Sequence, residues 1–175
     1  KEDKALVGRL FDHYFEINEG IGVNKSPELY GAFSTDAYSH TPGGKGAQQP
    51  GMTGQVKEDL LSRWGELGIE VQEGILTFDP FMLRYDEFLT ENQDYVYVNV
   101  LKERCSIALE KDSLGFTYCQ IPIIYQASHT SKIEVHFNDG ARRIIEGNQL
   151  DLTVSRMIFK RTHEIHKLVV FLMLD

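Results

Sequence analysis

Residues 131–146 read Ser-Lys-Ile-Glu-Val-His-Phe-Asn-Asp-Gly-Ala-Arg-Arg-Ile-Ile-Glu, and this stretch decides the fold class. Asn138-Asp139-Gly140 predicts a tight turn, because these residue types tolerate the positive φ angles that hairpin turns require. Apolar and polar residues alternate over Ile133–Phe137 before the turn, and Arg142–Ile145 follows the turn with two β-branched residues. A period of two is the pattern of a half-buried strand. The stretch therefore predicts an antiparallel hairpin.

The same period of two holds along the chain from Ile69 onward. Pro122 falls inside one alternating run and predicts a sheet edge or a bulge there, since proline cannot donate to a ladder. Residues 151–159 fit either a short helix or an irregular crossing. Short strands with turns about every 8–12 residues are typical of an antiparallel sandwich. The predicted strands span residues 69–72, 75–79, 95–101, 104–110, 114–120, 121–126, 131–138, 141–146 and 165–174.

Helical periodicity replaces this alternation near the N-terminus. Apolar residues recur at helical spacing over residues 3–18 and predict an amphipathic helix. A second helix is expected from Thr53, which can cap it, to Gly68, which favours a helix stop. The apolar face of this second helix, with Leu60, Trp64 and Leu67, is expected to be buried against the sheet.

These patterns predict an α+β fold in which a short N-terminal helix pair packs on an antiparallel β-sandwich. Residues 1–68 would form the helical segment, with a loop rich in Gly, Pro and Gln at 38–55, and residues 69–175 the sandwich domain. A chain of 175 residues suits one domain, or two small ones that share a core.

Charge limits the classes of partner. The chain holds 18 basic and 26 acidic residues, a formal net charge of −8, and neither half offers a basic face. Nucleic acid and anionic membranes are therefore not expected as partners. The apolar tail Leu168–Leu174 is too short for a membrane span.

Two cysteines, Cys105 and Cys119, cannot make a disulfide framework. They could form one bridge, but two free thiols on strands are the favoured interpretation. The chain starts at Lys1 without a signal peptide, so either a leader was removed or the chain belongs to something longer. The compartment stays open.

The loop at 38–55 is the most informative stretch for function. It holds five of the 15 glycines and two of the five prolines, and Lys45 is its only charged residue. Its amides Gln48, Gln49 and Gln55, with Tyr38 and His40, suit a neutral, hydroxyl-rich ligand. Sugars need planar donor–acceptor groups for vicinal hydroxyls and an aromatic face for stacking. The alternative is that the amides satisfy backbone groups in a tight loop.

Glu58 is the one candidate general acid or base in this region, although an acidic residue there also caps the helix start. No close carboxylate pair stands out for glycoside hydrolysis. A near match to a phosphate loop at 46–53 has Met52 in place of the required lysine, which argues against nucleotide binding. The six histidines are scattered, and there is no zinc motif or nucleophile elbow. No metal or cofactor is expected.

Gln120 belongs to a second polar and aromatic group, with Tyr118, Cys119 and Tyr125. An amide in the middle of an apolar strand needs partners. It could bond the loop at 38–55, a ligand, or simply a neighbouring strand.

One resemblance adds to this interpretation. The run Met52-Thr-Gly-Gln-Val-Lys-Glu-Asp-Leu-Leu-Ser-Arg-Trp-Gly-Glu-Leu-Gly-Ile69 leads through Glu70–Pro80 into strands. Over about residues 30–80 this resembles the C-terminal end of a bacterial six-hairpin (α/α) toroid glycosidase or sugar phosphorylase. A full toroid has about twelve helices, so the resemblance implies that the catalytic acids lie on a different part of such a protein.

The expected function is that of the C-terminal region of a carbohydrate-active protein, contributing a sugar-facing loop but not a complete catalytic pair. As an isolated chain it would be inactive. The partners would be a carbohydrate ligand and a helical toroid region. The alternatives are a stand-alone carbohydrate-binding module, or a structural interaction domain that docks on a partner chain through its helix pair.

Overall fold

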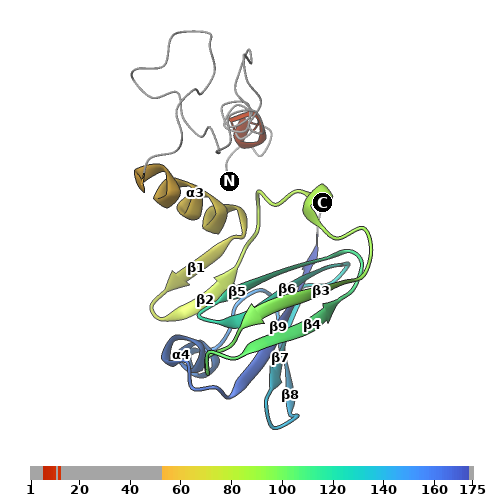
Figure 1. The fold of residues 1–175 in the computed structure, drawn as a ribbon. Helices are drawn as coiled ribbons and strands as arrows, with labels where there is room; N and C mark the ends of the chain where they lie inside the picture. The colour runs from red at the N-terminus through yellow and green to blue at the C-terminus, as the bar shows by residue number, and fades with distance from the viewer. Residues whose placement is uncertain (1–5, 11, 13–52, 174–175) are drawn as a thin grey trace. The chain divides into compact units, whose positions relative to one another are not determined.

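The computed structural model describes residues 6–10, 12 and 53–173, with the backbone alone for 53–59. The chain divides into two compact units, Lys1–Trp64 and Gly65–Asp175 (Figure 1). In the first unit residues 6–10 and 12 are helical, and helix α3 (Thr53–Glu66) begins there. The start predicted for the second helix is confirmed.

Gly68 ends this helical segment as the sequence predicts. Its φ is +61°, and its N–H donates to the Gly65 carbonyl at 3.0 Å. A Cβ at this position would lie 2.0 Å from the backbone of Asp79, so only glycine fits. The N–H of Asp79 in turn donates to the Gly68 carbonyl at 2.7 Å, which joins the end of the helix to the following hairpin.

The expected burial of the helix face is confirmed at one residue and wrong at two. Leu67 is buried, with 5% of its surface exposed. Leu60 and Trp64 are 56% and 49% exposed. Leu67 follows the last turn and joins the core of the second unit, whereas the apolar residues one and two turns earlier face outward.

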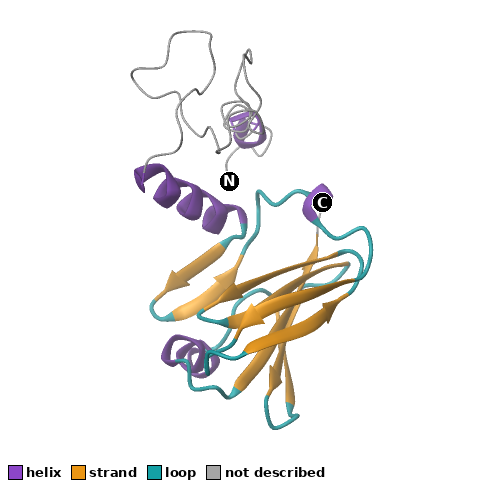
Figure 2. Ribbon diagram, viewed as in Figure 1, coloured by secondary structure: helices purple, strands orange, loops and turns teal. Residues whose placement is uncertain are grey.

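Gly65–Asp175 is strand-rich, with one helix of its own (Figure 2). Helix α4 covers the segment that the sequence left ambiguous, and Asp151 caps it by accepting from the N–H groups of Thr153 and Val154. Each strand lies within a few residues of its predicted range. The elements are β1 (Ile69–Gln72), β2 (Ile75–Phe78), the short 3-10 helix Tyr85–Glu87, β3 (Gln93–Val98), β4 (Arg104–Leu109), β5 (Ser113–Tyr118), β6 (Ile121–Ser128), β7 (Lys132–Phe137), β8 (Arg142–Glu146), α4 (Leu152–Lys160) and β9 (Ile165–Met173).

Within the described residues the strands form two hairpins, β1–β2 and β3–β4, and a five-stranded sheet of order β5-β6-β9-β7-β8. The predicted hairpin across Asn138-Asp139-Gly140 is confirmed as β7–β8. The expectation of purely antiparallel pairing is wrong for β6 and β9, which run parallel. The cause is topological. A short connection joins β6 to β7, so the two run in opposite directions, and a last strand inserted between them must lie parallel to one.

Pro122 lies in an interior strand, yet it interrupts no hydrogen-bond ladder on the β9 side. The pairing of β6 with β9 begins only at Ile123, opposite Leu168. On its other side Pro122 faces Thr117 of β5. The N–H that proline lacks therefore removes no hydrogen bond from the pairing of β6 with β9.

Tyr125 stands at the centre of the core. Its ring meets Phe78 of β2 edge-on at 6.1 Å and Phe116 of β5 at 5.0 Å between centroids. Helix α4 closes the same core, since the Leu76 N–H donates to the buried Ser155 hydroxyl at 3.1 Å. The largest fully buried side chains in the described part of the chain, besides Tyr125, are Phe78, Leu76, Pro122, Ile123, Ile133, Val135, Leu150, Val154, Ile158, Leu168 and Val170.

Candidate functional site

Most side chains that the sequence nominates as ligand-binding lie outside the described part of the chain. Residues 38–52 of the amide-rich loop lie outside the described residues, and its last three residues belong to the start of α3, which is described by its backbone alone. The residues concerned are Tyr38, His40, Gln48 and Gln49 in the loop, and Gln55 and Glu58 in α3.

Gln120 is described, and it does not lie in the middle of a strand. Cys119 and Gln120 form the two-residue turn between β5 and β6, with φ angles of 50° and 66°. The sequence prediction was wrong because this tight turn carries none of the usual Asn or Gly residues. The Gln120 Nε2 donates to the Asn99 carbonyl at 3.2 Å, which ties the turn to the β3–β4 hairpin.

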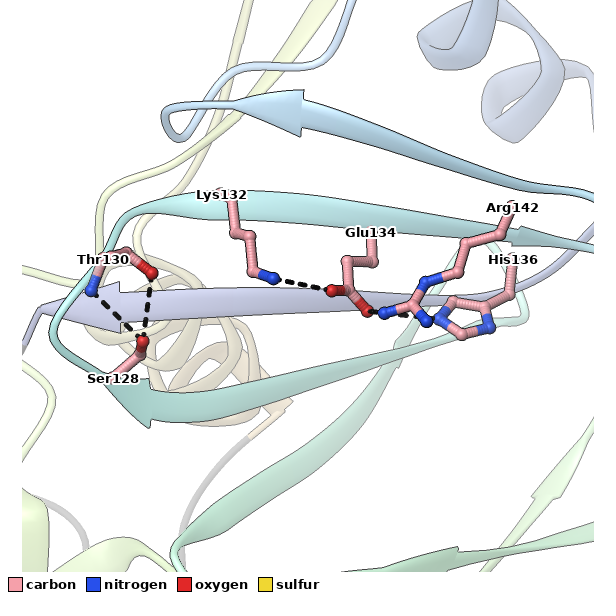
Figure 3. A network of polar contacts seen from close by, with 6 residues as sticks. All are labelled: Ser128, Thr130, Lys132, Glu134, His136 and Arg142. Atoms are coloured by element: carbon pink, nitrogen blue, oxygen red, sulfur yellow. Dashed lines mark hydrogen bonds and ion pairs between the residues drawn. The ribbon is translucent and has the colours of Figure 1, made fainter.

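A charged cluster, named here the outer-face cluster, lies on one face of the five-stranded sheet (Figure 3). It consists of Lys132, Glu134, His136 and Arg142. The first three alternate along β7 with core residues that are fully buried on the opposite face. Arg142 joins them from β8, where it is the direct partner of His136.

Glu134 lies at the centre of the outer-face cluster, with 4% of its side chain exposed. The Lys132 Nζ donates to its Oε1 at 2.8 Å, and an Arg142 Nη2 donates to its Oε2. Burial acts to raise the pKa of Glu134, but the hydrogen bonds and charges of Lys132 and Arg142 outweigh burial and hold that pKa below its usual value. Glu134 is therefore ionised at neutral pH and acts as an acceptor that orients two cations.

His136 is the neutral member of the cluster. Burial, together with the charges of Lys167 and Arg142, lowers its pKa, and Glu134 only partly opposes this. Its Nε2 lies 3.6 Å from the nearest Glu134 oxygen, is buried, and has no hydrogen-bond partner. At neutral pH the cluster thus presents an uncharged imidazole between cationic groups.

Lys132 is fixed from two sides. Besides its bond to Glu134, its Nζ lies 4.4 Å from the ring centroid of Phe171 on β9, a cation–π geometry. Arg142, by contrast, is 52% exposed and keeps donors that Glu134 does not use. Arg142 therefore supplies the solvent-exposed hydrogen-bond donors of the cluster.

Two kinds of feature are absent from the part of the chain that the structure describes. Residues 6–10, 12 and 53–173 contain no group of three or more His, Cys, Asp or Glu side chains placed to hold a metal ion. No helix among them has the length and apolar character needed to cross a bilayer. Both cysteines are free thiols, as favoured from the sequence.

The sequence analysis missed the outer-face cluster and treated His136 as one of several scattered histidines. The signal was present in the alternation itself. Lys132, Glu134 and His136 are spaced by two residues in a predicted strand, which places them on one face. Arg142 follows across a predicted hairpin turn, close enough in register to join them.

No family model matches this chain, and no curated protein does either. The candidate site is defined by its own geometry: an ionised buried carboxylate, the cations it orients and a partly buried neutral imidazole, with Arg142 as the exposed member.

Proposed function

We propose that this chain is the C-terminal region of a carbohydrate-active protein, related to the six-hairpin glycosidases and phosphorylases, and that it binds sugar without a complete catalytic pair. The observation that carries the proposal is the outer-face cluster. Vicinal hydroxyls of a sugar require planar hydrogen-bonding groups. The cluster offers such groups in the guanidinium of Arg142, which has unused donors, the neutral imidazole of His136 and the carboxylate of Glu134, which orients Arg142. The half-buried cation–π pair of Lys132 and Phe171 borders them.

The protonation state of Glu134 favours binding over chemistry at this cluster. Glycoside cleavage needs a carboxylic acid that holds its proton at working pH and delivers it to the leaving oxygen. Lys132 and Arg142 hold Glu134 ionised instead. Any catalytic acids of the whole protein would then lie on the helical part that the resemblance implies, and the loop at 38–55 would contribute a second sugar-facing surface.

We also propose that the strands form a sandwich that supports this face. Contacts between β2 and β6 support a second layer, since Phe78 packs edge-on against Tyr125. On the other side of the sheet Leu109 of β4 lies so close to Gly115 of β5 that a Cβ there would come within 2.6 Å of its methyl group. The five-stranded sheet is then covered in part on both faces.

Calorimetric titration with a panel of neutral and acidic oligosaccharides tests the proposal. Arg142→Ala should weaken the best ligand by more than tenfold, while Arg104→Ala, an equal charge change on exposed β4, should leave binding unchanged. The loop variant Gln48→Ala with Gln49→Ala should also lose more than tenfold, about 1.4 kcal/mol, which is within reach of two lost hydrogen bonds. A wild-type chain that binds no member of the panel would overturn the sugar-binding role.

An exposed apolar helix face favours the second candidate, an interaction domain. Leu60 and Leu61 are 56% and 65% exposed on α3. If this face docks on another copy of the chain, sedimentation equilibrium should show association that Leu60→Glu with Leu61→Glu abolishes. A monomer at all concentrations, in both proteins, would oppose docking between copies.

A further inference from the structure

Three basic side chains lie in one cross-strand row on the outer face of the sheet. His136 of β7 is the direct partner of Arg142 on β8 and of Lys167 on β9. Directly opposed residues of neighbouring strands have Cβ atoms about 4.5–5.5 Å apart, so the charges of Arg142 and Lys167 both act on the imidazole that lies between them. We call Arg142, His136 and Lys167 the basic row.

The carboxylates nearby neutralise the basic row only in part, because one carboxylate, Glu134, is shared between Lys132 and Arg142. Glu134 is already bonded to Lys132 and Arg142. Glu146 faces Lys132 at the other end of β8, four residues from Arg142, or about 13 Å along a strand. In the described part of the chain no acidic side chain forms an ion pair with the half-buried Lys167. A local cationic excess therefore stands on a chain whose net charge is −8.

The centre of the basic row also lacks a hydrogen-bond partner. The Nε2 of His136 is buried and makes no hydrogen bond, although buried polar atoms in folded proteins are generally satisfied. The same neighbours, Lys167 and Arg142, that repel a proton from this imidazole would attract a negative group. An oxyanion held between Arg142 and Lys167 would offset the two positive charges that act on His136.

We propose that the basic row binds the oxyanion group of an acidic oligosaccharide, the carboxylate of a uronic acid or a sulfate ester. The sugar part of this proposal rests on the proposed function; the oxyanion part rests on the row itself. The Arg142 fork grips two oxygens of such a group, Lys167 adds a point charge, and Glu134 keeps the fork in position. Hydroxyls of the attached ring meet the donors that remain on Arg142 and Lys132.

Calorimetry with trigalacturonate and its fully methyl-esterified form tests this proposal, because the two ligands share a skeleton and differ in charge. Wild type should bind the acid at least tenfold more tightly than the ester. Lys167→Gln should bring that ratio close to one, whereas Lys111→Gln, on the exposed turn between β4 and β5, should preserve it. A sulfated neutral oligosaccharide in a third titration distinguishes sulfate from carboxylate as the preferred group.

Each outcome separates the two proposals. Equal binding of acid and ester would leave the sugar site intact and overturn the oxyanion row. If no sugar binds, NMR titration with inorganic sulfate decides the row alone: sulfate should raise the pKa of His136 in wild type but not in Lys167→Gln. If no sugar binds and sulfate leaves the pKa of His136 unchanged, the row is likewise removed as a site.

Discussion

The hydroxyl of Tyr125 donates a hydrogen bond to the backbone carbonyl of Leu67, across 58 positions of sequence. Tyr125 is fully buried in β6, and Leu67 directly follows helix α3. One side-chain bond therefore joins the exit of the helix to the centre of the sheet. Burial, and secondarily the charge of Asp79, raises the pKa of Tyr125 far above its usual value, so the hydroxyl keeps its proton.

Tyr125→Phe should lower the free energy of unfolding by about 1–3 kcal/mol, because it leaves the Leu67 carbonyl without its partner in the core. Denaturant titration measures this loss. Tyr95→Phe, on the β3–β4 hairpin, is the matched control and should stay within about 0.5 kcal/mol of wild type. Equal small effects in both variants would show that the Tyr125 bond contributes little.

Gly68→Ala should be far more damaging than Gly140→Ala. Both glycines have positive φ, so alanine is strained at either position. At Gly68, however, the added Cβ would lie 2.0 Å from the Asp79 backbone, while at Gly140 nothing lies within 4 Å. The Gly140 variant should lose about 1 kcal/mol and the Gly68 variant several times as much in the same titration. A reversed order would contradict the close approach of helix exit and hairpin.

Leu60→Ala and Leu168→Ala separate the exposed helix face from the core. Leu168 is fully buried in β9, so its truncation should cost about 2–5 kcal/mol. Leu60 is 56% exposed, and its truncation should cost less than about 0.5 kcal/mol. A large loss at Leu60 in the isolated chain would mean that its helix face is covered after all, and would weaken the docking alternative.

Glu134 should make stability depend on pH in the acid range. Its folded pKa lies below the usual value of about 4.3, so its contribution is complete above that pH and is lost as the pH falls through the folded pKa. The difference in unfolding free energy between wild type and Glu134→Gln should therefore be largest near neutrality and shrink below about pH 4. A difference that stays constant down to about pH 3 would contradict ionised Glu134 as the stabilising form.

The isolated chain should not turn over common glycosides. The sequence offers no close carboxylate pair, and the buried Glu134 is ionised rather than poised to donate a proton. Incubation with aryl glycosides and oligosaccharides, with and without phosphate, should release no sugar above background. Turnover that disappears in Glu58→Gln would overturn this expectation and assign Glu58 the role of general acid.

The strands were predictable because their signal is local. The alternation of β7 and the Asn138-Asp139-Gly140 turn lie within a few residues of each other, and the structure confirms the hairpin. The turn at Cys119 and Gln120 was missed for the opposite reason. Its positive φ angles fall on residues that rarely adopt them, and the tie from Gln120 to Asn99 holds it from outside the local sequence.

The candidate site was only partly visible in the sequence. Spacing alone places Lys132, Glu134 and His136 on one face of a strand. Nothing in the spacing says that β9, about thirty residues further along, inserts beside β7 and brings Lys167 opposite His136. Burial, followed by the charges of Lys167 and Arg142, lowers the pKa of His136, and burial and Lys167 are set by the tertiary structure.

The sequence by itself determined the approximate ranges of the strands, the start of α3, the glycine that stops it and the hairpin turn of β7–β8. Tertiary structure alone decided the strand order β5-β6-β9-β7-β8, the parallel pair, the bond from Tyr125 to Leu67 and the basic row. The physical reason is the distance along the sequence over which each effect acts. Backbone preference and side-chain alternation act between neighbours, whereas strand insertion is set by the burial of distant apolar faces, which no local pattern encodes.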